Sequence, residues 1–162
     1  MGEIVTLDRL ARLRTGFRRN GKIVVFTNGT FDILHRGHVE YLRAARAMGD
    51  VLIVGLNSDA SIRRIKGDGR PINRAADRAA VLSALRSVDY VCIFGADTPA
   101  KIIARLVPDV LVKGADWKSS AIVGRDVVER HGGVVRRVRL TPGRSTTEII
   151  RRIRTSARPA PR

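Results

Sequence analysis

Two of the three histidines in this 162-residue chain, His35 and His38, lie three residues apart with Gly37 between them. They end the segment Thr-Asn-Gly-Thr-Phe-Asp-Ile-Leu-His-Arg-Gly-His, residues 27–38. Imidazoles donate hydrogen bonds to phosphate oxygens, and glycine lets the backbone approach a phosphate closely. We expect His38 at the start of a helix, where the N-terminus favours anions. The spacing indicates a phosphate site; the alternative is a pair of histidines that bond backbone carbonyls.

A second candidate anion site is Ser145-Thr146-Thr147-Glu148, which has the pattern of a helix capping box. A helix start needs a serine or threonine cap whatever the function, and the same N-terminus also makes a phosphate site. Arg144, just before it, has the planar guanidinium that binds phosphate in a bidentate manner.

Strand and helix signals alternate along the chain. Apolar runs predict five strands, at residues 23–27, 51–56, 89–94, 110–113 and 134–140. Helices are predicted at 7–19, 39–48, 60–66, 75–86, 97–107, 123–131 and from 145 onward. Continuous apolar strands joined by helices predict an α/β protein, with a five-stranded parallel sheet and helices on both faces.

The carboxyl edge of this predicted sheet is where the site should lie, because ligands of such sheets bind beyond the carboxyl ends of the strands. Four predicted strands end there in polar or glycine-rich sequence, at residues 27–30, 57–59, 113–116 and 141–145. We therefore expect these segments to converge on one pocket.

The motif Thr30-Phe31-Asp32 followed by His35-Arg36-Gly37-His38 resembles the signature of the HxGH nucleotidyltransferases, the cytidylyltransferase-like family. Further segments resemble the adenylyltransferase domain of ADP-heptose synthases, at residues 56–59, 66–71, 88–91, 97–99, 108–117 and 145–147. The resemblance covers about residues 22–153 and implies a Rossmann-like fold.

The resemblance also implies a reaction. An oxygen of D-glycero-D-manno-heptose 1-phosphate would attack the α-phosphorus of ATP, releasing pyrophosphate and giving ADP-heptose for a heptose-containing surface polysaccharide. Positioning and charge stabilisation would carry the catalysis. Mg²⁺ would be the cofactor, bridging phosphate oxygens rather than sitting in a site made by the protein alone. CTP or GTP as the nucleotide, and glycerol phosphate or another sugar or alcohol phosphate as the acceptor, stay open.

The family's functional residues carry over position by position. The resemblance implies catalytic contacts to the triphosphate from His35, His38 and Lys66. It implies nucleotide binding by Thr30, Phe31, Gly37, Arg144, Ser145, Thr146 and Thr147. It implies acceptor binding by Asp32, Asn57, Arg70, Lys113 and Asp116.

Several of these residues have a purely structural alternative. Lys66 would then be a solvated lysine at a helix end, Asp32 a turn-forming cap, and Asn57 the cap of the next helix. Trp117 would serve packing or ligand stacking. Among the remaining residues, we expect Cys92 in the core, His131 at a helix C-terminus and Arg78 as a surface charge of a helix.

The net charge of +16 by itself suggests a nucleic-acid partner. Residues 1–22 carry +4 and residues 136–162 carry +8, which leaves only +4 on the 113 residues between them. Aromatic residues, which stack on bases, make up only 4% of the chain. We expect no nucleic-acid partner; a nucleic-acid-binding module is the competing class of function, and a catalytically inactive scaffold is a third.

The length and the 44% hydrophobic content fit one folded domain. We expect an N-terminal helical extension at 1–22, the nucleotidyltransferase domain at 23–154 and a disordered tail at 155–162, standing alone without the sugar kinase to which many relatives are fused. We see no membrane span and no signal peptide, so we expect a cytoplasmic protein without membrane contact. The single cysteine excludes a disulfide framework, and the resemblance implies a homodimer.

Overall fold

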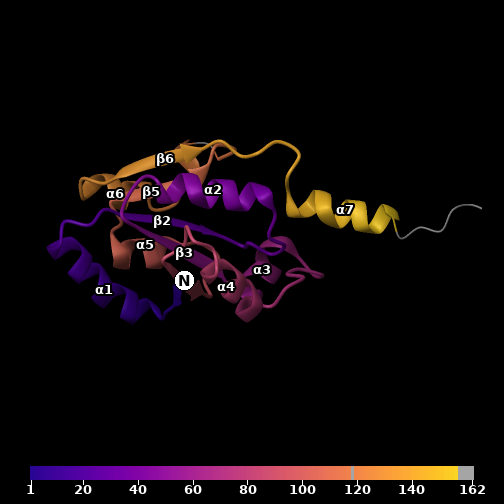
Figure 1. Ribbon diagram of the computed structural model, residues 1–162, viewed down its shortest axis with the longest axis horizontal. Coiled ribbons are helices and arrows are strands. Elements are labelled where there is room, and N and C mark those ends of the chain that lie inside the picture. The colour runs from indigo at the N-terminus through magenta and orange to yellow at the C-terminus, as the bar shows by residue number, and fades with distance from the viewer. Residues whose placement is uncertain (118, 157–162) are drawn as a thin grey trace, which may run out of the picture.

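The computed structural model describes residues 1–117 and 119–156, and its centre is a single parallel sheet (Figure 1). Within these residues six strands pair in the order β1-β4-β3-β2-β5-β6. They are β1 (Glu3–Ile4), β2 (Val24–Gly29), β3 (Val51–Asn57), β4 (Tyr90–Phe94), β5 (Val110–Gly114) and β6 (Val134–Val138). The parallel α/β fold is confirmed.

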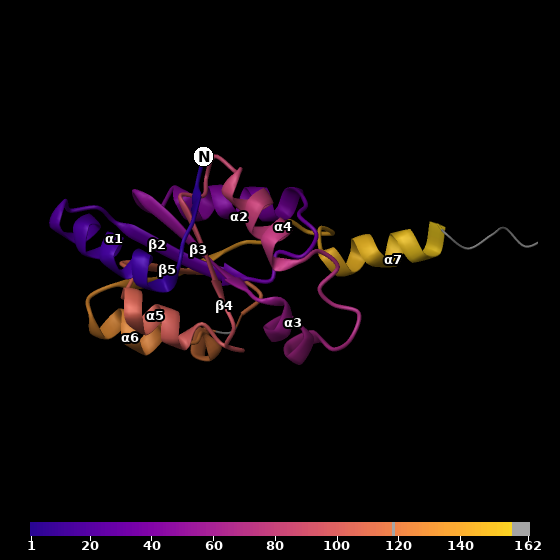
Figure 2. The same ribbon diagram turned by 90° about the horizontal axis from the view of Figure 1, so that it is seen from below.

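The helices follow the predicted alternation with shorter bounds at several ends. They are α1 (Leu7–Arg19), α2 (Arg36–Arg46), α3 (Asp59–Lys66), α4 (Ala75–Ser83), α5 (Ala100–Leu106), α6 (Arg125–Arg130) and α7 (Thr146–Ser156), with a 3₁₀ turn at Ser119–Ala121. Figure 2 shows α2 and α4 on one face of the sheet and α1, α5 and α6 on the other. No helix in the described part of the chain is long and apolar enough to cross a membrane.

The prediction of five strands was wrong by one. The sixth, β1, has only two residues, too few to show an apolar pattern, and pairs with β4 through Glu3 beside Tyr90 and Ile4 beside Val91. The first 22 residues, predicted as an extension, thus supply an edge strand and a packed helix. Leu10 of α1 is fully buried, so this segment contributes to the core.

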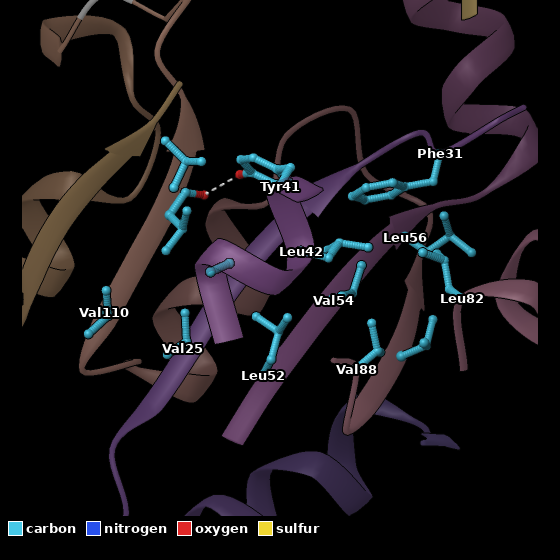
Figure 3. Close-up of a cluster of buried hydrophobic side chains, with 14 of the residues drawn as sticks. Val25, Phe31, Tyr41, Leu42, Leu52, Val54, Leu56, Leu82, Val88 and Val110 are labelled. Atoms are coloured by element: carbon cyan, nitrogen blue, oxygen red, sulfur yellow. Dashed lines mark hydrogen bonds between the residues drawn. The ribbon is translucent and has the colours of Figure 1, made fainter. Parts of the chain in front are cut away.

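The two sides of the sheet each have their own apolar core. Because successive side chains of a strand point to opposite faces, Leu52, Val54 and Leu56 of β3 pack under α2 and α4. Val51 and Ile53 pack against α1 and α5 on the other side. Figure 3 shows the first core, in which the Tyr41 hydroxyl donates to the carbonyl of Val112 at 3.2 Å. Burial of both faces explains why the central strands are continuous apolar runs.

The order of the strands creates a switch point between β2 and β5. From β2 the chain builds β3 and β4 to one side, then returns to place β5 and β6 on the other. Ligands of open parallel sheets bind in the crevice at such a point, outside the carboxyl ends of the strands. The segments that follow β2 and β5 therefore face one another across the predicted site.

The C-terminal helix α7 projects from the body of the protein (Figure 1), and none of its residues is buried. Residues 155 and 156, predicted in the disordered tail, form the end of this helix. The rest of the predicted tail, residues 157–162, lies outside the described residues.

Candidate functional site

A pocket of about 340 Å³ opens at the carboxyl ends of β2 and β5. Its walls come from those strand ends, the start of α2, the end of α3 and the start of α7. The structure thus brings together most of the predicted site residues: Thr30, Phe31, His35, Gly37, His38, Lys66, Lys113, Asp116, Arg144, Ser145, Thr146 and Thr147. Three predicted residues, Asp32, Asn57 and Arg70, do not line it.

The two histidines form a stacked pair in this pocket. His35 is the N-cap of α2, and its ring centroid lies 3.8 Å from that of His38 at an interplanar angle of 21°. The Phe31 ring packs on His38 at 5.2 Å. A β-carbon at Gly37 would meet the His35 Nδ1 at 3.1 Å, so glycine leaves room for the pair. The short spacing along α2 thus places both imidazoles on one wall.

Both Nδ1 atoms are buried and have no hydrogen-bond partner among the described residues. The alternative, in which backbone carbonyls satisfy these nitrogens, is therefore not what the structure shows. A buried polar atom without a partner costs free energy. A ligand that bonds them on entering the pocket would recover that cost.

Burial keeps this pair uncharged. Burial, then the charges of His35 and Lys66, lowers the pKa of His38 from 6.5 to about 4. Burial, then the charge of Arg144, lowers the pKa of His35. At neutral pH each imidazole therefore keeps one N–H donor and carries no charge. This N–H group can donate a hydrogen bond to a phosphate oxygen.

The low pKa of His38 predicts a pH-dependent stability. The unfolded chain, with a pKa near 6.5, binds this proton more tightly than the folded protein. Protonation therefore favours unfolding, and the penalty appears as pH falls below 6.5 and grows until about pH 4. We expect the free energy of unfolding to fall by about 2 kcal/mol more in the wild type than in His38→Gln between pH 7.5 and 5. Urea unfolding of both proteins at each pH measures this difference. An equal fall in the free energy of unfolding in the two proteins between pH 7.5 and 5 would contradict it.

The turn after β2 is held by a buried arginine. Arg78 of α4, whose side chain is 1% exposed, donates to the carbonyls of Thr30 at 2.6 Å and Asn73 at 2.9 Å, and to Asp59 at 2.7 Å. The prediction of a surface charge was wrong, because an arginine within a helix gives no sequence signal of such partners. Phe31, which follows Thr30 in this turn, has a left-handed φ of 43°, which is unusual for a bulky residue. Arg78 thus fixes a turn that lines the pocket.

Asp32 does not line the pocket and instead anchors residues 70–73. Its buried carboxylate accepts from Arg70 Nε at 2.7 Å and from the N–H groups of Ile72 at 2.8 Å and Asn73 at 2.9 Å. Burial would raise its pKa, but the bonds from Asn73, Ile72 and Arg70 outweigh burial and lower it. These contacts match the turn-cap alternative. Acceptor binding by Asp32 and Arg70 stays a prediction.

Asn57 ends β3 and is buried. Its Nδ2 donates to the Ser61 hydroxyl in α3 at 3.0 Å. Ser61 in turn donates to the carbonyl of Ala96 at 2.9 Å. This chain of bonds ties β3 to the following helix. The N-cap of α3 is Ser58, which accepts from the N–H of Ser61 at 3.2 Å, so the alternative in which Asn57 caps this helix was wrong. A contact of Asn57 with the acceptor stays a prediction.

The end of the pocket formed by β5 holds a desolvated lysine. Burial lowers the pKa of Lys113 to about 8. Its Nζ donates to Asn28 Oδ1 at the end of β2 and lies 5.6 Å from the centre of the Trp117 ring. Trp117 is 49% exposed, so it is not a core residue. The sequence analysis missed Asn28, although this residue lies within the segment 27–38 that ends in the two histidines, and it left the role of Trp117 open.

The start of α7 supplies the opposite wall. Ser145 Oγ accepts from the N–H of Glu148 at 3.1 Å, so the serine half of the predicted capping box is confirmed. The Thr146 hydroxyl donates to the carbonyl of Ile33 at 3.3 Å, which ties α7 to the histidine segment. Helix starts leave N–H groups without intrahelical partners, and the residues at this helix start, Ser145, Thr146 and Thr147, line the pocket together with His35.

Lys66, the last residue of α3, adds a positive charge at the rim. Burial, then the charge of Arg70, lowers its pKa, while Asp32 opposes the shift. Asp116 supplies a carboxylate to the pocket. No group of three or more His, Cys, Asp or Glu side chains in the described residues is placed to hold a metal ion. The lining therefore offers mostly hydrogen-bond donors and cations, as an anionic ligand requires.

Two other expectations are confirmed outside the pocket. Cys92 is buried in β4, and burial raises the pKa of its thiol to about 11. His131 is the C-cap of α6, and its Nδ1 lies 2.8 Å from the carbonyl of Val127. It is exposed and far along the chain from the pair in the pocket, so it is a natural control for them.

Comparison with known proteins identifies the family of the chain. Residues 26–152 match the Cytidylyltransferase-like family. The chain is 57% identical over 136 residues to the bifunctional protein HldE of Syntrophotalea carbinolica, covering 84% of this chain and 28% of that protein. It is 51% identical over 154 residues to HldE of Citrifermentans bemidjiense, and this match covers 95% of this chain and 32% of that protein. The chain thus spans about a third of the length of these relatives.

Solved structures show the same fold. A lipopolysaccharide core biosynthesis protein from Thermoplasma volcanium superposes with a TM-score of 0.61 at 32% identity, covering 75% of this chain and 98% of that one. A pantoate-beta-alanine ligase from Francisella tularensis gives a TM-score of 0.64 at 13% identity, covering 91% of this chain and 69% of that one. This second likeness supports the fold alone. On these matches and the histidine motif, the chain belongs to the cytidylyltransferase-like family of nucleotidyltransferases.

Proposed function

We propose that this chain transfers AMP from ATP to D-glycero-D-manno-heptose 1-phosphate, giving ADP-heptose and pyrophosphate. The observation that carries the chemistry is the stacked His35–His38 pair, with both Nδ1 atoms buried and without partners in the described residues. The choice of acceptor is supported by the resemblance to ADP-heptose synthases and by the relatives named HldE. The name of the Thermoplasma volcanium protein supports a place in surface polysaccharide synthesis.

The charges of the pocket suit a triphosphate. We infer that the phosphates lie between the histidine pair and the start of α7, with Lys66 and Arg144 at the rim. The acceptor phosphate oxygen attacks the α-phosphorus, the bond from that phosphorus to the oxygen of the β-phosphate breaks, and pyrophosphate leaves. The N–H donors of His35 and His38 bond oxygens whose charge grows in the transition state. No residue forms a covalent bond to the substrate.

The base would occupy the end of the pocket formed by β5, so Lys113 would lie beside the nucleotide instead of making the acceptor contact that the resemblance implies. Lys113, Trp117 and the backbone of Gly114 line this end. A half-exposed indole offers a face for stacking, while backbone N–H and carbonyl groups bond the polar edge of a base. Recognition of adenine rather than cytosine or guanine is part of the proposal.

Mg²⁺ is the proposed cofactor. The cation would enter with the triphosphate and be held by phosphate oxygens, since hard cations prefer oxygen ligands and Mg²⁺ keeps part of its water shell. When bound, it neutralises charge on the phosphates.

A substrate matrix tests this function. Four nucleoside triphosphates are incubated with Mg²⁺ and each of several sugar 1-phosphates and alcohol phosphates, and pyrophosphate release is measured. We expect the fastest release with ATP and heptose 1-phosphate. Release with CTP and glycerol phosphate instead would favour the alternative substrates. No release with any pair, together with a salt-sensitive shift of labelled RNA, would favour the nucleic-acid-binding class.

We also propose that the protein works in the cytoplasm as a homodimer. Nucleoside triphosphates are made there, and the resemblance implies the dimer. Light scattering during gel filtration should give twice the 17.8 kDa mass of one chain. A mass of one chain at micromolar concentration would contradict the dimer.

A further inference from the structure

A second cavity, which we call the outer groove, adjoins the pocket. It measures about 470 Å³ and lies between residues 68–72 and one side of α7. Figure 2 shows the loop between α3 and α4 running beside this helix. The two cavities share Thr147. A ligand bridging the point where they meet would therefore touch both.

The loop wall of the outer groove is fixed to the catalytic segment. Arg70 and Ile72 line the groove, and both bond the carboxylate of Asp32. Asp32 lies three residues before His35 in the same segment. The ion pair between Asp32 and Arg70, whose side chain is only 16% exposed, therefore links the loop wall of the groove to the segment that carries the histidines.

The helix wall of the outer groove is positively charged. It is lined by Arg151 and Arg154 together with Thr147, Ile150 and Thr155. The Thr155 hydroxyl donates to the carbonyl of Arg151 at 2.7 Å and can still accept. Arg151 is paired with Glu148 through two bonds of 2.8 and 2.7 Å. Arg154 has no ion-pair partner among residues 1–117 and 119–156. Its guanidinium is therefore the cation left available to a ligand.

The chemistry of the outer groove suits a phosphorylated polyol. Hydroxyl groups need both donors and acceptors, and the groove offers arginine donors, two threonine hydroxyls and the carboxylate of Asp68. Its excess positive charge favours an anion. The inner pocket, at about 340 Å³, is in the size range for a single ligand. A reaction that joins two substrates needs a second site adjoining the first.

We propose that the outer groove binds the sugar of the acceptor. Its 1-phosphate would lie at Thr147, where the groove meets the pocket, and its hydroxyls would extend along α7 past Arg154. This inference rests on the proposed function, because it assumes a sugar 1-phosphate as acceptor. It makes Arg154 an acceptor-binding residue, which the family motifs do not include.

Steady-state kinetics of Arg154→Ala in the full chain tests the groove, with ATP and D-glycero-D-manno-heptose 1-phosphate varied in turn. We expect the KM for the sugar phosphate to rise about 10-fold or more, the loss expected for a hydrogen bond to a charged group. The KM for ATP, and the thermal stabilisation by ATP, should stay as in the wild type. Arg152→Ala is the matched control, because Arg152 is an exposed arginine beside Ile149 and Ile153 rather than in the groove.

The outcomes separate the groove from the function. An unchanged KM for the sugar phosphate in Arg154→Ala, with an active wild type, overturns the proposal that the outer groove binds the sugar. It leaves the proposed transfer reaction unaffected. An equal rise in Arg152→Ala also overturns it, since the effect would then be general attraction by basic charge. A wild type that turns over no sugar phosphate overturns the function and, with it, this inference.

Discussion

Replacing His38 with alanine should lower kcat by about 10²–10³-fold, the cost of removing one donor to a charge that develops in the transition state. His38 is held between the rings of His35 and Phe31, so its position is set before substrate arrives. Because the lost bonds strengthen in the transition state, kcat and kcat/KM for ATP should fall by similar factors. Pyrophosphate release at saturating substrates measures the effect.

The third histidine provides the control for His38. His131 is exposed at the end of α6, so His131→Ala should keep kcat within about twofold of the wild type. Circular dichroism and urea unfolding show whether His38→Ala keeps the fold. A folded His38→Ala protein with near-normal kcat would remove the proposed role of this side chain.

Replacing Arg78 with methionine should lower the free energy of unfolding by about 3–5 kcal/mol, because it breaks a buried ion pair from one side. Asp59 would lose its partner, and the carbonyls of Thr30 and Asn73 would lose their donor. Urea unfolding measures this loss. Arg105→Met, an exposed arginine in α5, should change the free energy of unfolding by less than about 0.5 kcal/mol.

Arg78 is a positioning residue, so replacing it should also weaken nucleotide binding in the pocket. The Thr30–Phe31 turn lines the nucleotide site, and Phe31 packs on His38. A folded Arg78→Lys protein keeps the charge but cannot bond three acceptors in the same geometry. We expect its KM for ATP to rise more than its kcat falls. A wild-type KM for ATP in Arg78→Lys, together with a lower free energy of unfolding, would show that Arg78 stabilises the fold without positioning the nucleotide site.

Much of this site could be predicted from sequence because its signals are local. The segment from Thr30 to His38 carries its own glycine, two histidines and helix start. The cap at Ser145 is set by residues three apart. The central strands are apolar on both faces, which marks them as parallel and places their carboxyl ends together.

The remaining features depend on partners that are distant in the chain. Arg14 bonds Asp109 at 2.7 Å, and Lys113 bonds Asn28. The stacking of the imidazoles of His35 and His38, with the Phe31 ring packed on His38, is likewise a feature of the folded chain. An arginine has the same sequence signal whether it faces water, as Arg105 does, or lies buried, as Arg78 does.

What the amino-acid order determined by itself was the alternation of strands and helices, the phosphate-binding segment and the edge of the sheet at which it lies. Only the tertiary structure decided the pairing of β1 with β4, the buried role of Arg78 and the outer groove beside α7. The physical reason is that hydrophobic periodicity and caps act over a few residues. The free energy of a buried charge or an edge strand depends on groups that only the folded chain brings near.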